Sequence, residues 1–354
     1  MSTRDTRWSV RLRRSGRVGS LAALLMVGVL SLAACGGGSN SGSSSSGGSV
    51  KTATLISTQP INDKGVVQDF VAGFQQETEA DKIKSNVVVL SDPSTYESTL
   101  SSVAARSDLV LTTFPPMIQA VTQVAPQYPK VKFLLLDARL AQSQPNVQEL
   151  FFQENQSSYL AGVVAGSMTK TDKVGFLGSL HQDVINRYLV GYYYGVKAVN
   201  PKAAVCYAYV GATNDPALGK QFAVTLYNQG VDIIHAATSG TEIGVYQAAE
   251  QEKKYLIGAD VDIRPFAPNY GLTAAGPDFS AAAKLVVKQF ADGSFNAGFH
   301  SYGLKDGLVR LLPYNEKLVP QDVQAKVAQA KSDIISGKIT VPGDQAVSQL
   351  KNCS

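Results

Sequence analysis

The chain has 354 residues, with 32 Lys and Arg against 28 Asp and Glu, and a formal net charge of +4. Residues 1–34 contain six arginines and one aspartate, so the rest of the chain carries a net charge near −1. It has no clustered Lys/Arg stripe, which argues against nucleic acid as a partner. The length allows two domains with cores of their own.

The first 34 residues have the features of an export signal. Arginines precede an apolar run at 21–32, which is too short to span a bilayer as a permanent helix. The sequence Leu32-Ala33-Ala34-Cys35 resembles a bacterial lipobox, in which the cysteine takes a diacylglycerol. We therefore expect a lipoprotein signal peptide at 1–34 and lipidation at Cys35. Arg13-Arg14 leaves general secretory and twin-arginine export open.

A tether follows the signal. Residues 36–49 are only Gly, Ser and Asn, a composition that cannot bury apolar surface and is typical of a flexible linker. We assign 35–50 to the lipidated cysteine and this tether. The globular part, from residue 51, is then expected outside the cytoplasm, anchored by lipid to the cell membrane.

The next segment alternates short β-branched-rich runs with helix-like stretches. The runs are 52–57, 86–91, 109–113 and 132–137, and the helical stretches are 65–80, 96–107 and 116–128. This βαβα pattern predicts a parallel sheet with helices on both faces. Loops that follow the carboxyl ends of such strands are the usual place for a ligand.

The pattern then repeats in a second segment. Helices are expected at 156–169, 184–199, 216–229 and 243–251, and strands at 173–177, 204–210, 233–237 and 255–260. A short strand at 272–274, a helix at 279–291, an extended stretch at 298–312 and a helix at 320–336 complete the chain. The predicted fold class is α/β, with two Rossmann-like lobes joined by a multi-crossover hinge.

The predicted lobes exchange segments near the end of the chain. We assign 51–154 plus 272–297 to the N-terminal lobe, 155–271 plus 298–345 to the C-terminal lobe, and 346–354 to a tail. The crossovers are expected near Asn155, Asn269 and Gly298.

Short motifs in the loops carry a resemblance to a known family. They are Asn62-Asp63-Lys64-Gly65, Glu154 with Ser158-Tyr159-Leu160-Ala161-Gly162, Lys173-Val174-Gly175-Phe176-Leu177-Gly178 and Gly258-Ala259-Asp260-Val261-Asp262. In this order, over residues 52–343, the chain resembles the basic membrane protein family, lipoprotein receptors for purine nucleosides that feed ABC importers. The resemblance implies a type I periplasmic-binding-protein fold that closes over one small solute, with an ABC permease as partner.

Several polar residues are candidates for the ligand site. Asp137 and Asp260 each end a predicted strand, where a carboxylate could accept hydrogen bonds from two sugar hydroxyls. The resemblance places Asp63 and Lys64 beside the ligand. The full set of candidates is Asp63, Lys64, Phe114, Asp137, Thr213, Ser239, Gly240, Thr241 and Asp260. Helix capping and turn formation are the alternative roles for these residues.

Departures from the family bear on the ligand. Val66 and Thr213 stand where relatives carry phenylalanines that stack the purine, and the base-reading lysine is missing after Leu272-Thr273-Ala274-Ala275. Replacement rings could come from Phe114, Tyr188 or Phe266. The expected ligand is therefore a nucleoside or a related heterocycle.

Catalytic and metal motifs are missing from the sequence. His181, His235 and His300 are scattered, and there is neither a nucleophile elbow nor a phosphate-binding loop. We expect a monomeric binding protein with no catalytic residue, metal or cofactor. A lipoprotein that senses a ligand and signals to a membrane partner, and an extracellular nucleoside hydrolase, remain as alternatives. Whether Cys206 and Cys353 form a disulfide also stays open, because the sequence gives no distance between them.

The anchor gives a first testable prediction. Cys35→Ser removes the thiol that would receive the lipid, so the precursor should stay unlipidated and uncleaved. Mass spectrometry and membrane fractionation of wild type and variant measure this. A variant that matures to the same mass and remains in the membrane fraction contradicts the lipobox interpretation.

Overall fold

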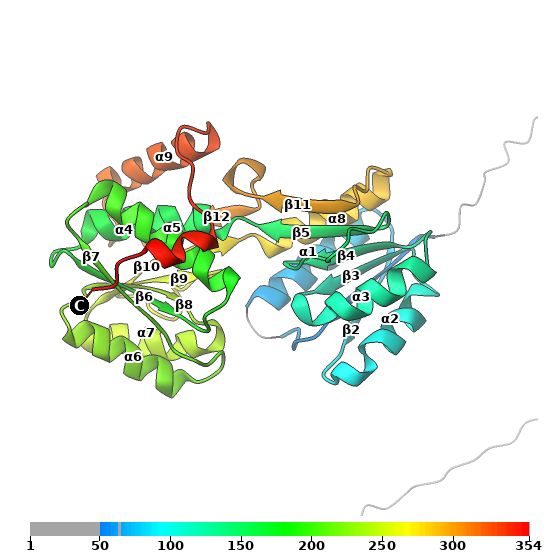
Figure 1. Cartoon of the computed structure of the whole chain (residues 1–354), viewed down its shortest axis with the longest axis horizontal. Coiled ribbons are helices and arrows are strands. Elements are labelled where there is room, and N and C mark those ends of the chain that lie inside the picture. The colour runs from blue at the N-terminus through cyan, green and yellow to red at the C-terminus, as the bar shows by residue number, and fades with distance from the viewer. Residues whose placement is uncertain (1–49, 63–64, 354) are drawn as a thin grey trace, which may run out of the picture. The chain divides into compact units, whose positions relative to one another are not determined.

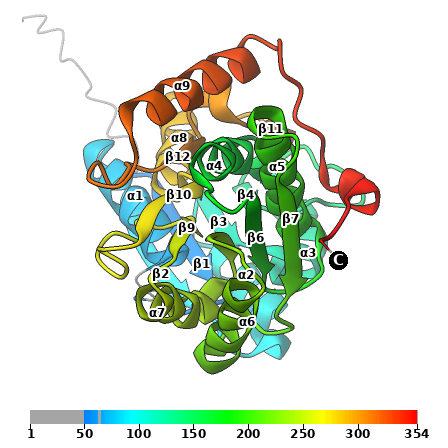
Figure 2. The same cartoon turned by 90° about the vertical axis from the view of Figure 1, so that its left-hand side faces the viewer.

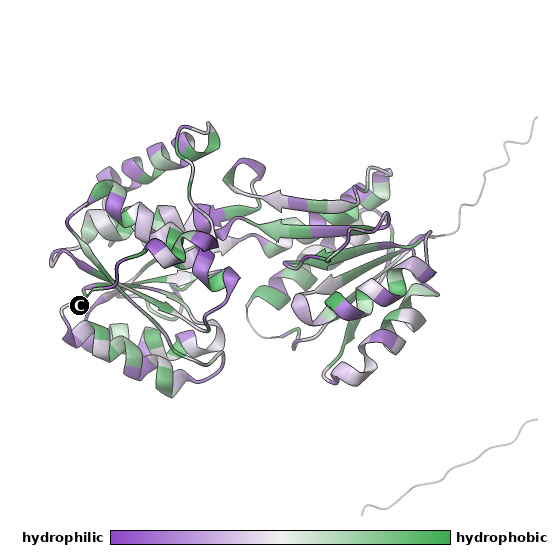
Figure 3. Ribbon diagram, viewed as in Figure 1, coloured by the Kyte–Doolittle hydropathy of each residue, from purple (hydrophilic) through white to green (hydrophobic). Residues whose placement is uncertain are grey.

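The computed structural model describes residues 50–62 and 65–353 of the chain. The predicted signal peptide, Cys35 and nearly all of the tether lie outside these residues, as do Asp63 and Lys64. Two six-stranded sheets organise the described part (Figures 1 and 2). Figure 3 shows apolar residues concentrated along the strands, as expected for sheets covered on both faces. Within the described residues, none of the helices combines the length and apolarity needed to cross a membrane.

The first lobe is built on a fully parallel sheet of order β11-β5-β4-β3-β1-β2. Its strands are β1 (Thr52–Ser57), β2 (Lys84–Val89), β3 (Leu109–Thr113), β4 (Lys132–Leu136), β5 (Val147–Phe152) and β11 (Gly298–Tyr302). Helices α1 (Val66–Ala80) and α8 (Phe279–Asp292) share one apolar core with the sheet. Helices α2 (Tyr96–Ala104) and α3 (Ile118–Val124) share another.

The second lobe is built on a sheet of order β12-β10-β9-β8-β6-β7, in which only the β10–β12 pair is antiparallel. Its strands are β6 (Lys173–Gly178), β7 (Ala204–Tyr209), β8 (Ile233–Ala237), β9 (Tyr255–Ala259), β10 (Gly271–Pro277) and β12 (Val309–Leu311). Helices α4 (Glu154–Met168), α5 (Asp183–Val199) and α9 (Gln321–Ile335) contribute to one core. Helices α6 (Pro216–Asn228) and α7 (Glu242–Glu252) contribute to the other.

The chain passes between the two sheets three times. It does so at Gln153, at Asp278, and in the segment 303–308 between β11 and β12. The second and third passages lie several residues beyond the predicted positions, so two strands change lobes. β10 belongs to the second sheet, not the first as predicted. β11 belongs to the first sheet, not the second.

Strand pairing explains these two differences. β10 extends the second sheet because it runs parallel to β9, with Thr273 opposite Ile257, and all seven of its residues are buried. β11 runs parallel to β5, with Ser301 opposite Phe151. β5 itself was missing from the sequence-based prediction. An isolated apolar run indicates a strand but does not say which sheet it joins.

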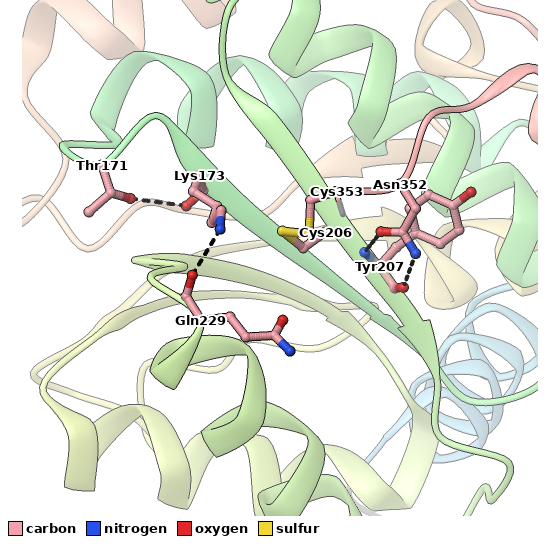
Figure 4. Close-up of a disulfide and its surroundings, with 7 residues drawn as sticks. All are labelled: Thr171, Lys173, Cys206, Tyr207, Gln229, Asn352 and Cys353. Atoms are coloured by element: carbon pink, nitrogen blue, oxygen red, sulfur yellow. Dashed lines mark hydrogen bonds between the residues drawn. A yellow bond between two sulfur atoms is a disulfide. The ribbon is translucent and has the colours of Figure 1, made fainter.

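The C-terminal tail is bound to the outer strand of the second sheet. Cys353 forms a disulfide with Cys206 of β7 (Figure 4). The Asn352 side chain accepts a hydrogen bond from the Tyr207 amide and donates one to the Tyr207 carbonyl, both at 2.9 Å. The question that the sequence left open is thus answered in favour of the disulfide. The tail also contains a short 3₁₀ helix, η6 (Asp344–Gln349).

Helices α4 and α5 pack with their backbones in close contact. A Cβ added at Gly191 would meet the main chain of Asn155, and one added at Gly195 would meet that of Tyr159. Gly162 of α4 lies in the same way against the carbonyl of Tyr192. The Ser158 hydroxyl consequently reaches the Tyr188 carbonyl on the other helix at 2.6 Å. Glycine is needed at these positions because any side chain would separate the helices.

We predict that Gly195→Ala destabilises the protein. The new methyl group overlaps the Tyr159 carbonyl, so the helices must move apart at a cost of about 1–3 kcal/mol, the usual range for overpacking. Urea unfolding followed by circular dichroism measures the change. On an exposed helix the same substitution would stabilise by about 1 kcal/mol, so a gain in stability would contradict the tight-packing explanation.

Candidate functional site

Four residues that follow central strands have a left-handed backbone. Phe114 (φ 61°) follows β3, Asp137 (φ 48°) follows β4, Ser239 (φ 56°) comes shortly after β8, and Asp260 (φ 64°) follows β9. Each pair comes from two neighbouring strands of one sheet. Positive φ is costly for side chains other than Gly, and such strain clusters at ligand sites. The backbone thus singles out four of the candidates predicted from the sequence.

Asp260 is held by a tyrosine from helix α5. The Tyr188 hydroxyl donates a short hydrogen bond to Asp260 Oδ1. Gly276 of β10 lies directly beneath this carboxylate, because a Cβ there would overlap Oδ1. Burial raises the pKa of Asp260 to about 7, and the negative charge of Glu154 adds to this, while the bond from Tyr188 opposes it.

Asp137 is held by an arginine from the same helix. Arg187 Nη2 lies 3.4 Å from Asp137 Oδ1, while its Nε donates to Glu154 Oε2 at 2.6 Å. The guanidinium also lies over the ring of Phe151, 4.1 Å from the ring centre. Asp137 follows a strand of the first sheet and Asp260 one of the second, so α5 contacts the strand ends of both sheets.

A third acidic group supports the strand ends of the second lobe. Glu242 starts α7 and is buried, and its carboxylate accepts hydrogen bonds from the Tyr246 hydroxyl at 2.7 Å and the Ala259 amide at 3.1 Å. Burial raises the pKa of Glu242 to about 8, and the nearby Asp260 raises it further. Glu242 is not among the candidates predicted from the sequence, although an acidic residue in the first turn of a helix was a visible signal.

The loops after β7 and β8 contain the remaining described candidates. Thr213, Ser239 and Gly240 are exposed, and a Cβ at Gly240 would meet the Asn214 side chain 2.9 Å away. Thr241 differs because it is buried. Its hydroxyl accepts a hydrogen bond from the Asp215 amide at 2.9 Å, so it joins the two loops.

The three aromatic candidates have different surroundings. Phe114 is half-buried and meets Phe279 edge-on, with 6.3 Å between ring centres. Tyr188 is only 3% exposed and offers no free ring face. Phe266 is 47% exposed and stacks on Tyr246. Phe114 and Phe266 are therefore the two candidate rings with accessible surface.

Val66 is one of the two positions at which the family resemblance implies a stacking phenylalanine. It is the first residue of α1 and is packed partly into the first-lobe core. The other position, Thr213, is exposed.

Two other polar features have internal roles. His235 is fully buried, with Nδ1 3.1 Å from the Ile257 carbonyl and Nε2 3.1 Å from the Ser158 hydroxyl. Burial lowers the pKa of His235 to about 4, so the ring is neutral near pH 7. Asp262 forms an ion pair with Arg264. Across the described residues, no three His, Cys, Asp or Glu side chains are grouped in a way that could hold a metal ion.

Two α/β lobes with mostly parallel sheets, linked by three passages of the chain, have the architecture of periplasmic solute-binding proteins. Two solved structures share it. An ABC transporter solute-binding protein from Aeropyrum pernix superposes with a TM-score of 0.73 at 21% identity, over 85% of this chain and 96% of that one. One from Conexibacter woesei gives 0.71 at 25% identity, over 83% and 99%.

Sequence comparison identifies the family. The family model described as ABC transporter substrate-binding protein PnrA-like matches residues 50–345. The ABC transporter nucleoside-binding protein BmpA of Lactococcus lactis is 31% identical over 353 residues, 92% of this chain and 99% of that one. The CD4+ T-cell-stimulating antigen of Listeria monocytogenes is 32% identical over 350 residues, 91% and 97%.

The chain belongs to this family of solute-binding proteins. Both the resemblance to the basic membrane proteins and the predicted fold class are thereby confirmed. The family binds substrates and does not transform them, which also confirms that the chain is not an enzyme.

Buried acids with raised pKa values predict how stability depends on pH. In the folded state Asp260 and Glu242 keep protons that the unfolded chain has lost near pH 7, so the free energy of unfolding should fall from pH 6.5 to 8.5. His235 titrates below this window when folded. Urea unfolding at a series of pH values measures the slope.

Glu242→Gln should make that slope shallower, because the amide does not titrate. Glu79→Gln, an exposed position on α1, is the matched control and should leave the slope unchanged. Equal slopes in wild type and Glu242→Gln would show that Glu242 does not retain its proton.

Proposed function

We propose that this protein is a lipid-anchored, extracytoplasmic receptor that captures a nucleoside or related heterocycle and delivers it to an ABC importer permease. Asp137 and Asp260 are the proposed anchors for the ligand's hydroxyl groups. The proposed unit is a monomer whose two lobes close over the solute by rotation about the three passages between the sheets.

The observation that carries this proposal is the pair of carboxylates presented by the two sheets. Each follows a central strand, each has a strained backbone, and each is held by one of two adjacent residues of α5. Charge-assisted hydrogen bonds to vicinal hydroxyls are about twice as strong as neutral ones, which makes carboxylates effective sugar anchors. A ligand that contacts both Asp137 and Asp260 would link the two lobes and favour their closed arrangement.

The nucleoside part of the proposal is supported by a relative. A homologue 31% identical to this chain is described as nucleoside-binding. The base, however, should be recognised differently here, because Val66 and Thr213 stand where the resemblance implies stacking rings. Gly276 adds a second reason. It follows the segment after which the resemblance implies a base-reading lysine, and any side chain at Gly276 would collide with Asp260.

The membrane part of the proposal rests on the sequence and on relatives. The lipobox-like sequence ending at Cys35 and the Gly/Ser tether are typical of an anchored receptor. Relatives described as basic membrane proteins, such as that of Borrelia garinii at 28% identity, support an association with the membrane.

We predict that Asp260→Ala weakens ligand binding about 10- to 100-fold. This corresponds to the loss of one hydrogen bond to a charged group, about 1.5–3 kcal/mol. Isothermal titration calorimetry with a panel of nucleosides, bases and flavins, applied first to wild type, identifies the ligand and then measures the change.

Asp262→Ala is the matched control, since this neighbouring carboxylate is engaged by Arg264 and should not contribute to binding. Thermal melting verifies that both variants fold. Unchanged affinity in a folded Asp260→Ala variant would remove Asp260 from the site. If no member of the panel binds to wild type, the nucleoside assignment is wrong.

A further inference from the structure

Arg187 has an unusual position for a charged side chain. It is 6% exposed, and its contacts come from three segments: Phe151 of β5, Glu154 at the first passage between the sheets, and Asp137 after β4. Arg187 itself belongs to α5 of the second lobe. The guanidinium therefore lies where the two lobes meet, with its flat face on a ring and its edge toward two carboxylates.

Glu154 fixes the orientation of this guanidinium. Its two carboxylate oxygens accept hydrogen bonds from Arg187, Oε2 from Nε at 2.6 Å and Oε1 from Nη2 at 3.3 Å. The planar fork of arginine suits such a two-oxygen contact, which an ammonium group cannot reproduce. Nη2 then also points toward Asp137 Oδ1, 3.4 Å away. The Glu154 carboxylate thus positions Arg187, and Arg187 in turn contacts the Asp137 carboxylate.

The ring beneath Arg187 is part of a longer stack. Phe151 contacts Phe299 of the neighbouring strand β11, with 5.6 Å between ring centres. Arg139 covers Phe299 at 4.5 Å. Arg139, Phe299, Phe151 and Arg187 therefore form a continuous row at the edge of the first sheet, in which two adjacent rings lie between two cations. This row supports Arg187 through the ring of Phe151.

Asp137 has two other acidic groups close to it and one cation. Glu154 and Asp260 both act on Asp137 as like charges, and Arg187 is the cation that acts on it within the described residues. Burial and the two acids hold the pKa of Asp137 well above its usual value, and Arg187 opposes them. Asp344 of η6 is a further acid near Arg187 and Glu154.

We propose that Arg187 is a positioning residue, which orients Asp137 so that the first lobe presents a hydrogen-bond acceptor to the ligand. Tyr188, the next residue, does the corresponding work for Asp260, so that one turn of α5 prepares one carboxylate from each lobe. The role of Asp137 toward the ligand rests on the proposed function. The effect of Arg187 on Asp137 does not, and it can be tested without any ligand.

The first experiment follows the Asp137 carboxyl group by carbon NMR in ligand-free full-length protein labelled at aspartate, with the signal assigned from Asp137→Asn. In Arg187→Gln the titration midpoint of Asp137 should rise by about one pH unit or more, the usual effect of removing an opposite charge at this range. Arg187→Lys keeps the charge without the fork and should give a smaller rise. It provides the same test if Arg187→Gln does not fold.

The second experiment measures ligand affinity from pH 6 to 9 by calorimetry, using the solute that wild type binds. Because Asp260 titrates in both proteins, the informative quantity is the ratio of the two dissociation constants. We expect Arg187→Gln to bind about tenfold more weakly near pH 6.5, and the ratio to shrink as the pH rises and Asp137 ionises.

Arg264→Gln is the matched control, because it removes an exposed arginine that forms an ion pair with Asp262. It should change neither the Asp137 midpoint nor the ratio. An unchanged Asp137 midpoint in folded Arg187→Gln overturns the positioning role, and so does a ratio that does not vary with pH. If no solute binds to wild type but the midpoint shifts as expected, the proposed function fails while the positioning role stands.

Discussion

The close packing of α4 against α5 is the constraint on which the rest of the site depends. Glycines remove the side chains that would separate the two helices, and the backbones therefore meet. α4 begins with Glu154 directly after the first passage between the sheets, and α5 carries Arg187 and Tyr188. Only this short separation lets Glu154 reach the guanidinium. The packing of these two helices thus determines where two carboxylates point.

The electrostatics of the site follow from that geometry. In the described part of the chain, Arg187 is the cation beside both Asp137 and Glu154, while the partner of Asp260 is the neutral Tyr188 hydroxyl. Buried carboxylates are costly unless they are paired and hydrogen-bonded. A polyol bound as proposed would bring hydroxyl donors to Asp137 and Asp260. The proposed site would then trade stability of the ligand-free protein for affinity toward a solute rich in hydroxyl groups.

The sequence predicted most of the strands, although not β5, and the residues that end them, but not the network that holds those residues. Alternating apolar runs were enough to place Asp137 and Asp260 at strand ends, because local periodicity decides where a strand stops. Arg187 and Glu242 were not predicted, because their roles depend on contacts with residues distant in the sequence. Arg187 contacts Glu154, 33 residues away, and Glu242 contacts the Ala259 amide, 17 residues away. The exchange of β10 and β11 between the lobes was missed for the same reason. Pairing partners are a property of the whole fold.

The C-terminal tail has a consequence for how the protein meets other molecules. β7 is the last strand of its sheet, and its outer main-chain groups would otherwise be open to a strand from another molecule. The Asn352 amide satisfies both main-chain groups of Tyr207, the Cys353 amide donates to the Val205 carbonyl at 3.2 Å, and the disulfide keeps the tail in place. Asn352 and Cys353 thereby cover part of the outer edge of β7. A chain truncated before Asn352 would expose the unpaired main-chain groups of this edge, which can pair with a strand of another molecule.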